Sequence, residues 1–174
     1  MKYTITTLSG LAAGVLALGF ASASAWGHAF MIEKEVKAGS WHIVEIAIPH
    51  GCVGSPTTEV RMQMPEGLIQ VRPEVKPGWT LSTVSTELEE PIRIADVVIG
   101  ERVEEVKWSG GSLPDLHMER FAVMVLMPRE PGRRMWFKTI QICEEGEHRW
   151  VEIPEGDKSW SDYKEPSPYL DLVE

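Results

Sequence analysis

The sequence predicts an all-β domain, a sandwich or barrel, behind a cleavable signal peptide. Short segments in which apolar and polar residues alternate recur along the chain, and this period of two is typical of half-buried strands. Turn signals rich in Gly and Pro separate the segments at the spacing that a sandwich or barrel requires. A helical period with caps is absent from the sequence, apart from a short turn near 113–120.

The first 27 residues have the composition of an export signal. Lys2 supplies the positive start, residues 11–20 form an apolar core, and small residues follow through Ala25. An uncleaved anchor is the alternative, but about ten apolar residues are too few for a bilayer, which needs ~20. We therefore predict that residues 1–27 are removed and that the mature chain is periplasmic, with no membrane span.

Two cleavage positions fit the small-x-small rule, and the pattern does not choose between them. A cut after Gly27 makes His28 the first residue, whose α-amine and ring nitrogen can grip one metal ion together. A cut after Ala25 places His28 third in the chain. A third-position histidine can close a square-planar nitrogen set with the amine and two deprotonated amides, which suits Cu(II).

Nine strands follow in order. The first, Trp41–Ile48, places His42 on the same face as Val44, Ile46 and Ile48 and ends at Pro49. The others are predicted at 60–64, 68–72, 80–87, 93–99, 104–108, 120–127, 135–143 and 148–153. The alternation stops after Pro154, so we expect a domain at 28–154 and a C-terminal extension at 155–174.

Composition limits the classes of function. The mature chain of about 147 residues is long enough for one domain with a core. The net charge of −9 becomes −10 when Lys2 is removed, which argues against nucleic acid as a partner because phosphates require a basic face. Cys52 and Cys143 form an even pair, and in an oxidising compartment such a pair predicts one long-range disulfide. A thiolate pair that holds a metal is the alternative.

The chain resembles the YcnI-like family of exported copper-binding domains, formerly a domain of unknown function. The resemblance begins with His28-Ala29, Ile48-Pro49 and the segment 56–60. It continues through 64–67, 77–79, 108–111, Phe137-Lys138 with Gln141, Gly146 and Trp150. It thus extends from residue 28 to about residue 153.

The resemblance implies a cupredoxin-like, immunoglobulin-like β-sandwich that binds one Cu(II) through a single-histidine brace. By motif, His28 supplies its α-amine and ring nitrogen, Glu59 supplies a carboxylate oxygen, and Trp150 lies near the metal. Both residues also have an ordinary structural explanation without a metal. Glu59 alternates with Val60 and can be a solvent-facing strand residue, and Trp150 can pack in the core. The sequence departs from some relatives after Pro49, where it continues His50-Gly51-Cys52 rather than with an acidic residue.

The function that follows is copper homeostasis without catalysis. The resemblance implies a periplasmic carrier, or metallochaperone, that delivers Cu(II) to a membrane copper transporter or to an assembling cuproenzyme. One alternative is an oxidative copper enzyme related in site chemistry to lytic monooxygenases, and another is a metal-free envelope sandwich. His50 and His148 flank the two cysteines, so a bridge would make them neighbours and candidates for a secondary metal site.

Overall fold

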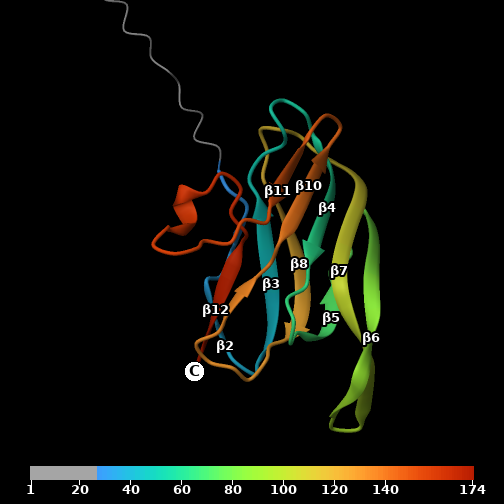
Figure 1. The fold of residues 1–174 in the computed structure, drawn as a ribbon. Helices are drawn as coiled ribbons and strands as arrows, with labels where there is room; N and C mark the ends of the chain where they lie inside the picture. Colours follow the sequence, from blue (N-terminus) through green and yellow to red (C-terminus); the bar gives the residue numbers. More distant parts are fainter. Residues whose placement is uncertain (1–26) are drawn as a thin grey trace, which may run out of the picture.

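The computed structural model describes residues 27–174, which form two facing β-sheets and a smaller third sheet (Figure 1). The all-β sandwich prediction is confirmed. The predicted signal peptide and the cut after Ala25 fall on residues outside the described part of the chain, which leaves only Gly27 of that segment in view. Within residues 27–174, no helix is long and apolar enough to cross a membrane.

The first sheet has the strand order β1-β3-β8-β5. Its strands are β1 (Phe30–Met31), β3 (Trp41–Ile48), β8 (Glu119–Leu126) and β5 (Ile69–Pro73). β3 has the predicted bounds and pairs with β8 in an antiparallel register along all eight residues. The short strand β1 pairs with the end of β3, Phe30 opposite Ala47, and this pairing fixes the chain directly after His28.

The second sheet has the strand order β11-β10-β4-β7-β6. Its strands are β11 (Glu147–Trp150), β10 (Thr139–Cys143), β4 (Thr57–Gln63), β7 (Val97–Leu113) and β6 (Thr80–Ile94). In β10, Thr139, Gln141 and Cys143 are buried and alternate with half-buried residues, as one face of a sheet requires. Gln141 lies opposite His148 of β11 and Val60 of β4, so the inner face of this sheet edge carries polar groups.

The C-terminal segment belongs to the domain, which corrects the predicted boundary at residue 154. β12 (Tyr169–Val173) lies between β2 (Glu35–Lys37) and β9 (Arg134–Trp136), parallel to the first and antiparallel to the second. Its Leu170 and Leu172 are each only 1% exposed. Two apolar positions are too few to stand out as a strand pattern in sequence, but their burial fixes the segment in the fold.

Two other strand predictions need correction. The predicted strand 93–99 contains a turn, because β6 ends at Ile94 and β7 begins at Val97, and together they form one long hairpin that extends past the sandwich (Figure 1). Ala95 in this turn has a φ of 50°, a left-handed conformation that sequence patterns rarely reveal outside glycine. The predicted strand 135–143 is divided between β9 and β10.

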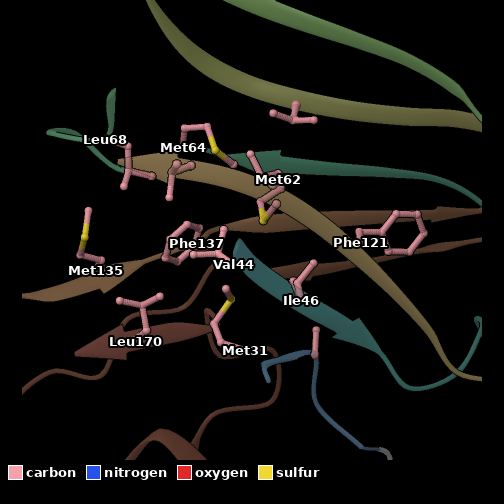
Figure 2. Packing of buried hydrophobic residues seen from close by; sticks show 14 of the residues in the cluster. Met31, Val44, Ile46, Met62, Met64, Leu68, Phe121, Met135, Phe137 and Leu170 are labelled. Carbon is pink, nitrogen blue, oxygen red and sulfur yellow. The ribbon is translucent and has the colours of Figure 1, made fainter. Parts of the chain in front are cut away.

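The core fills the space between the two larger sheets (Figure 2). Val44, Ile46 and Ile48 of β3 are buried as predicted. The methionines Met62, Met64 and Met127 are also buried, whereas Met124 is half-buried. Flexible thioethers fit irregular gaps in a core. His42 is half-buried beside this row, with its Nε2 3.1 Å from a carboxylate oxygen of Glu33.

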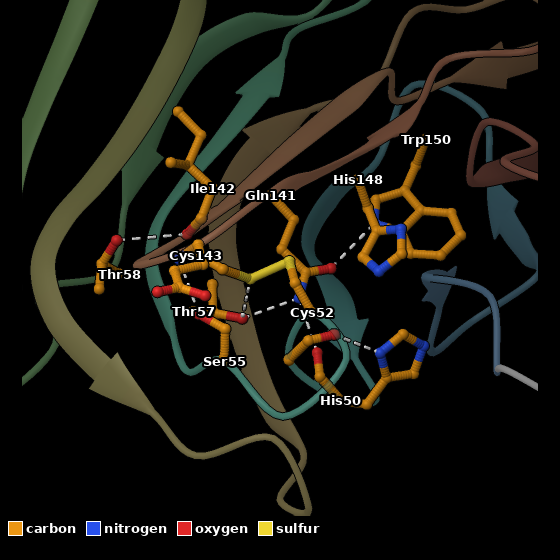
Figure 3. The surroundings of a disulfide bond; sticks show 12 residues. His50, Cys52, Ser55, Thr57, Thr58, Gln141, Ile142, Cys143, His148 and Trp150 are labelled. Carbon is orange, nitrogen blue, oxygen red and sulfur yellow. Dashed lines mark hydrogen bonds between the residues drawn. A yellow bond between two sulfur atoms is a disulfide. The ribbon is translucent and has the colours of Figure 1, made fainter.

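The predicted disulfide is present between Cys52 and Cys143 (Figure 3). It joins the loop that follows β3 to the end of β10, across a sequence separation of 91 residues. The same loop closes on itself, because the backbone N–H of Cys52 donates to the carbonyl of Ser55 and the reverse bond is also made. The bridge therefore ties the loop after β3 to the edge of the second sheet.

Removal of this bridge should lower the free energy of unfolding. In the chain-entropy model a crosslink of this length contributes roughly 4 to 5 kcal/mol, and we expect a loss of that order in the double variant Cys52→Ser, Cys143→Ser, measured by urea unfolding. Reductant should destabilise the wild-type protein to the same extent and leave the double variant unchanged. A double variant that unfolds at the wild-type urea concentration would contradict the prediction.

Candidate metal site

His28 lies where the chain enters the first sheet. Ala29 and Met31, directly after it, are 0% and 1% exposed and anchor this end of the chain in the core. The half-buried His28 ring lies between two indoles, with ring centroids 6.1 Å from Trp150 and 4.9 Å from Trp160. Burial, and after it the nearby His50, lowers the pKa of His28. This shift favours the neutral ring, which is the form that binds metal.

His50 is the second histidine of this site. It follows Pro49 at the end of β3, and its ring centroid lies 6.2 Å from that of Trp150. Its Nε2 is 2.8 Å from the carbonyl oxygen of Gly27, and its Nδ1 is 2.5 Å from the carbonyl oxygen of Gly51. A neutral imidazole carries one N–H, so it donates to only one of these two oxygens.

A buried hydrogen-bond network holds Trp150 and the His50 loop together (Figure 3). Trp150 is 1% exposed, and its indole Nε1 donates to Gln141 Oε1 at 3.0 Å. The Gln141 amide nitrogen donates to the His50 carbonyl at 2.6 Å and to the Thr57 hydroxyl at 2.7 Å. One side chain thus connects β10, β11, β4 and the loop after β3.

His148 lies on the other side of Trp150, and its ring stacks on the indole with centroids 4.9 Å apart. The centroids of His50 and His148 are 5.4 Å apart, so the two histidines are neighbours, as the disulfide predicts. The Nδ1 of His148 is 2.9 Å from a Glu165 carboxylate oxygen. Burial raises the pKa of Glu165, but hydrogen bonds from His148 and from the Arg149 backbone outweigh burial and hold the pKa below its ordinary value.

The segment between β11 and β12 covers this cluster. Glu165 binds His148, and the short 3-10 helix Trp160–Asp162 places the Trp160 ring against His28. Trp160 is fixed in turn, because its Nε1 donates to the Ser167 carbonyl at 2.7 Å. Sequence reasoning missed both Trp160 and Glu165. The signal in the sequence was one tryptophan in the largely polar stretch 155–167.

Glu59 is not brought to this cluster. It lies on β4 opposite Ile142 of β10, on the face away from the buried Val60 and Gln141, as strand alternation predicts. Its carboxylate forms an ion pair with Arg61, its neighbour on that face. Trp150 lies on the inner face of the sheet. The structure therefore places Trp150 and His50 near His28 and places Glu59 on the opposite face, so the ligand role of Glu59 stays a prediction.

The side chains alone do not make a conventional metal cage. Among residues 27–174, no group of three or more His, Cys, Asp and Glu side chains is arranged to hold a metal ion. A site that takes one nitrogen from the chain terminus needs fewer side chains, and His28 with His50 fits that smaller set. Both cysteines are in the disulfide, so the alternative prediction of a thiolate pair that holds a metal is wrong.

A family match places this geometry in context. A family described as a domain of unknown function, DUF1775, matches residues 28–172. The chain belongs to the DUF1775 family. The match includes the β12 segment, in agreement with the structure, where the C-terminal strand is part of the domain.

The DUF1775 domain shares its fold with a solved structure. The crystal structure of an uncharacterized protein from Nocardia farcinica, described as having an immunoglobulin-like fold, has a TM-score of 0.63 to this chain at 20% identity. The likeness covers 84% of this chain and 99% of that one, and at this identity it shows the fold alone. No curated protein matches the chain.

The Gln141 network should stabilise the DUF1775 domain strongly. Gln141→Leu leaves the Trp150 indole, the Thr57 hydroxyl and the His50 carbonyl without their partner, and each such buried group costs about 1–3 kcal/mol. We expect a loss of about 3 kcal/mol in urea unfolding. Gln63→Leu, at the exposed end of β4, is the matched control and should change stability by less than about 0.5 kcal/mol. Equal effects of the two substitutions would contradict this role.

Proposed function

We propose that the mature DUF1775 domain binds one Cu(II) ion at its N-terminus and acts as a periplasmic copper carrier. The observation that carries this proposal is the position of His28. It is the first residue of the predicted mature chain and of the family match, and its ring lies in a cluster with His50 and two tryptophans. The resemblance to exported copper-binding domains agrees with this arrangement.

The chemistry depends on where the signal peptide is cut. Cleavage after Gly27 turns the peptide nitrogen of His28 into an α-amine, which can join the ring nitrogen on one metal ion. Amine and imidazole nitrogens in a tetragonal arrangement favour Cu(II). With Gly27 still attached, that nitrogen is an amide and the pair is incomplete. We therefore favour the cut after Gly27 for this function.

The surroundings of His28 favour a carrier over an enzyme. Trp150 and Trp160 lie against the half-buried His28 ring, whereas an oxygenase of the lytic type acts on its substrate at an open, flat face. The second histidine, His50, is the one observation that favours the oxidative alternative. A copper-loaded protein that consumes reductant and oxygen and forms product from a defined substrate would establish that alternative. The recipients we propose are a membrane copper transporter or an assembling cuproenzyme.

Copper titration of two N-terminal forms tests the proposal. The chain that begins at His28 should bind one equivalent of Cu(II), lose tight binding on His28→Ala, and release the metal when urea unfolds it, because the other ligands come from the fold. The chain that begins at Trp26 should keep copper in urea, since a third-position histidine binds with its own backbone amides.

The exposed His117 provides the control, and His117→Ala should bind copper as the wild type does. Isothermal titration and mass spectrometry give the affinity and the stoichiometry. If the His28-first chain binds no Cu(II), or binds it equally well after His28→Ala, the proposed function is wrong.

Copper affinity should fall as the pH falls, in two stages. The α-amine, with an ordinary pKa of ~7.7 to 8.0, must lose its proton to bind, so affinity drops about tenfold per pH unit below that range. The pKa of His28 is lowered by burial and by His50. Protons therefore compete with copper for the ring only below the ordinary histidine pKa of about 6.5. Competition with a chelator between pH 8.5 and 5.5 measures both stages. Constant affinity from pH 8 to 6.5 would show that the amine is not a ligand.

A further inference from the structure

We infer that His50 completes the copper site as a third nitrogen ligand. It takes the role of third ligand that the resemblance gives to the carboxylate of Glu59. This inference rests on the proposed function, and it concerns the chain's own departure from its relatives. It would make the site one of three nitrogen donors: the His28 amine, the His28 ring and the His50 ring. Three separate features of the structure support it.

The first feature is the direction of the His50 ring. Its Nε2 is 2.8 Å from the carbonyl oxygen of Gly27, and that carbonyl carbon is bonded to the nitrogen of His28. Cleavage after Gly27 removes the carbonyl and leaves an amine on the same nitrogen. The His50 Nε2 therefore already points at the peptide unit that becomes the mature chain terminus.

The second feature is the other ring nitrogen. Nδ1 of His50 is 2.5 Å from the Gly51 carbonyl oxygen, so in the neutral ring a proton on Nδ1 leaves Nε2 with its lone pair. A histidine that binds metal commonly donates its second ring N–H to a carbonyl or carboxylate in this way, which fixes the tautomer and the ring orientation. In the uncleaved chain the other tautomer is also possible, in which Nε2–H donates to the Gly27 carbonyl oxygen. Cleavage removes that acceptor, and the form with Nδ1–H on the Gly51 carbonyl then directs the Nε2 lone pair at the new chain terminus.

The third feature is the rigidity of the His50 loop. Gln141 donates to the His50 carbonyl at 2.6 Å, and the Gly51 N–H donates to the Asp115 carbonyl at 3.1 Å. At Gly51 an added Cβ would overlap the Ser55 carbonyl oxygen and approach the Asp115 Cα to 2.9 Å. One residue further, Cys52 is bonded to Cys143. A ligand held on such a scaffold needs little reordering to bind metal.

The contacts of the other candidates lie elsewhere than at the chain terminus. The Glu59 carboxylate pairs with Arg61 on the outer face of the sheet. His148 stacks on Trp150, and its Nδ1 is held by Glu165. Of the polar residues near Trp150, His50 is the one whose ring contacts the residue that cleavage removes.

Electron paramagnetic resonance of the His28-first chain with one equivalent of Cu(II) tests this assignment. Pulsed measurements count the imidazole rings on the metal, and we expect two in the wild type and one in His50→Gln. Loss of partners one step removed from a metal costs 10- to 100-fold in affinity, so loss of a direct ligand should weaken binding by at least about tenfold. Glu59→Gln and the exposed control His117→Gln should keep wild-type affinity and both rings.

The outcomes separate the two proposals. A wild-type protein that binds Cu(II) through His28 but shows one imidazole overturns the role of His50 and leaves the proposed function standing. A loss of binding in Glu59→Gln with His50→Gln unaffected does the same and restores the carboxylate. The wild-type ring count does not depend on any substitution, so a count of one overturns the role of His50 even if His50→Gln folds poorly. A wild type that binds no Cu(II) removes both proposals together.

Discussion

The buried amide of Gln141 is the interaction on which the site end of this domain depends. Its two N–H groups and its oxygen are satisfied by the His50 carbonyl, the Thr57 hydroxyl and the Trp150 indole. In an apolar interior an unmet polar group is costly, whereas a fully satisfied network rigidifies its surroundings. The network therefore fixes the position of Trp150 and of the His50 loop, and these form part of the surface against which His28 packs.

How much of the fold the sequence predicts depends on how local each signal is. β3 has its predicted bounds because Val44, Ile46 and Ile48 repeat at a strand period and Pro49 ends the run. β12 escapes prediction because it is stabilised by β2, which lies near the other end of the chain, and by β9, which is separated from it by β10 and β11. Local patterns define strands with a full apolar face, whereas a short strand is defined by the partners that flank it.

The site shows the same division between local and distant information. Alternation correctly places Glu59 and Val60 on opposite faces of their strand, but it does not predict which of the two faces lies nearer to His28. That orientation follows from the pairing of β4 with β10 and of β10 with β11, which puts Trp150 and Gln141 on the inner face. His28 and Trp150 come together as the resemblance implies. His50 was marked in the sequence by its place beside Cys52 and by the absence of an acidic residue after Pro49.

The pairing of β1 explains how the domain can be cut beside its site without losing its fold. The ladder of β1 begins at Phe30, opposite Ala47, and Ala29 is already buried. A cut after Gly27 therefore spares these anchors and removes the carbonyl that meets His50. The same cut creates the His28 amine. One hydrolysis would therefore supply this amine as a ligand and expose the His50 ring as another. A site built in this way stays incomplete until export is finished, since neither change can occur while the leader is attached.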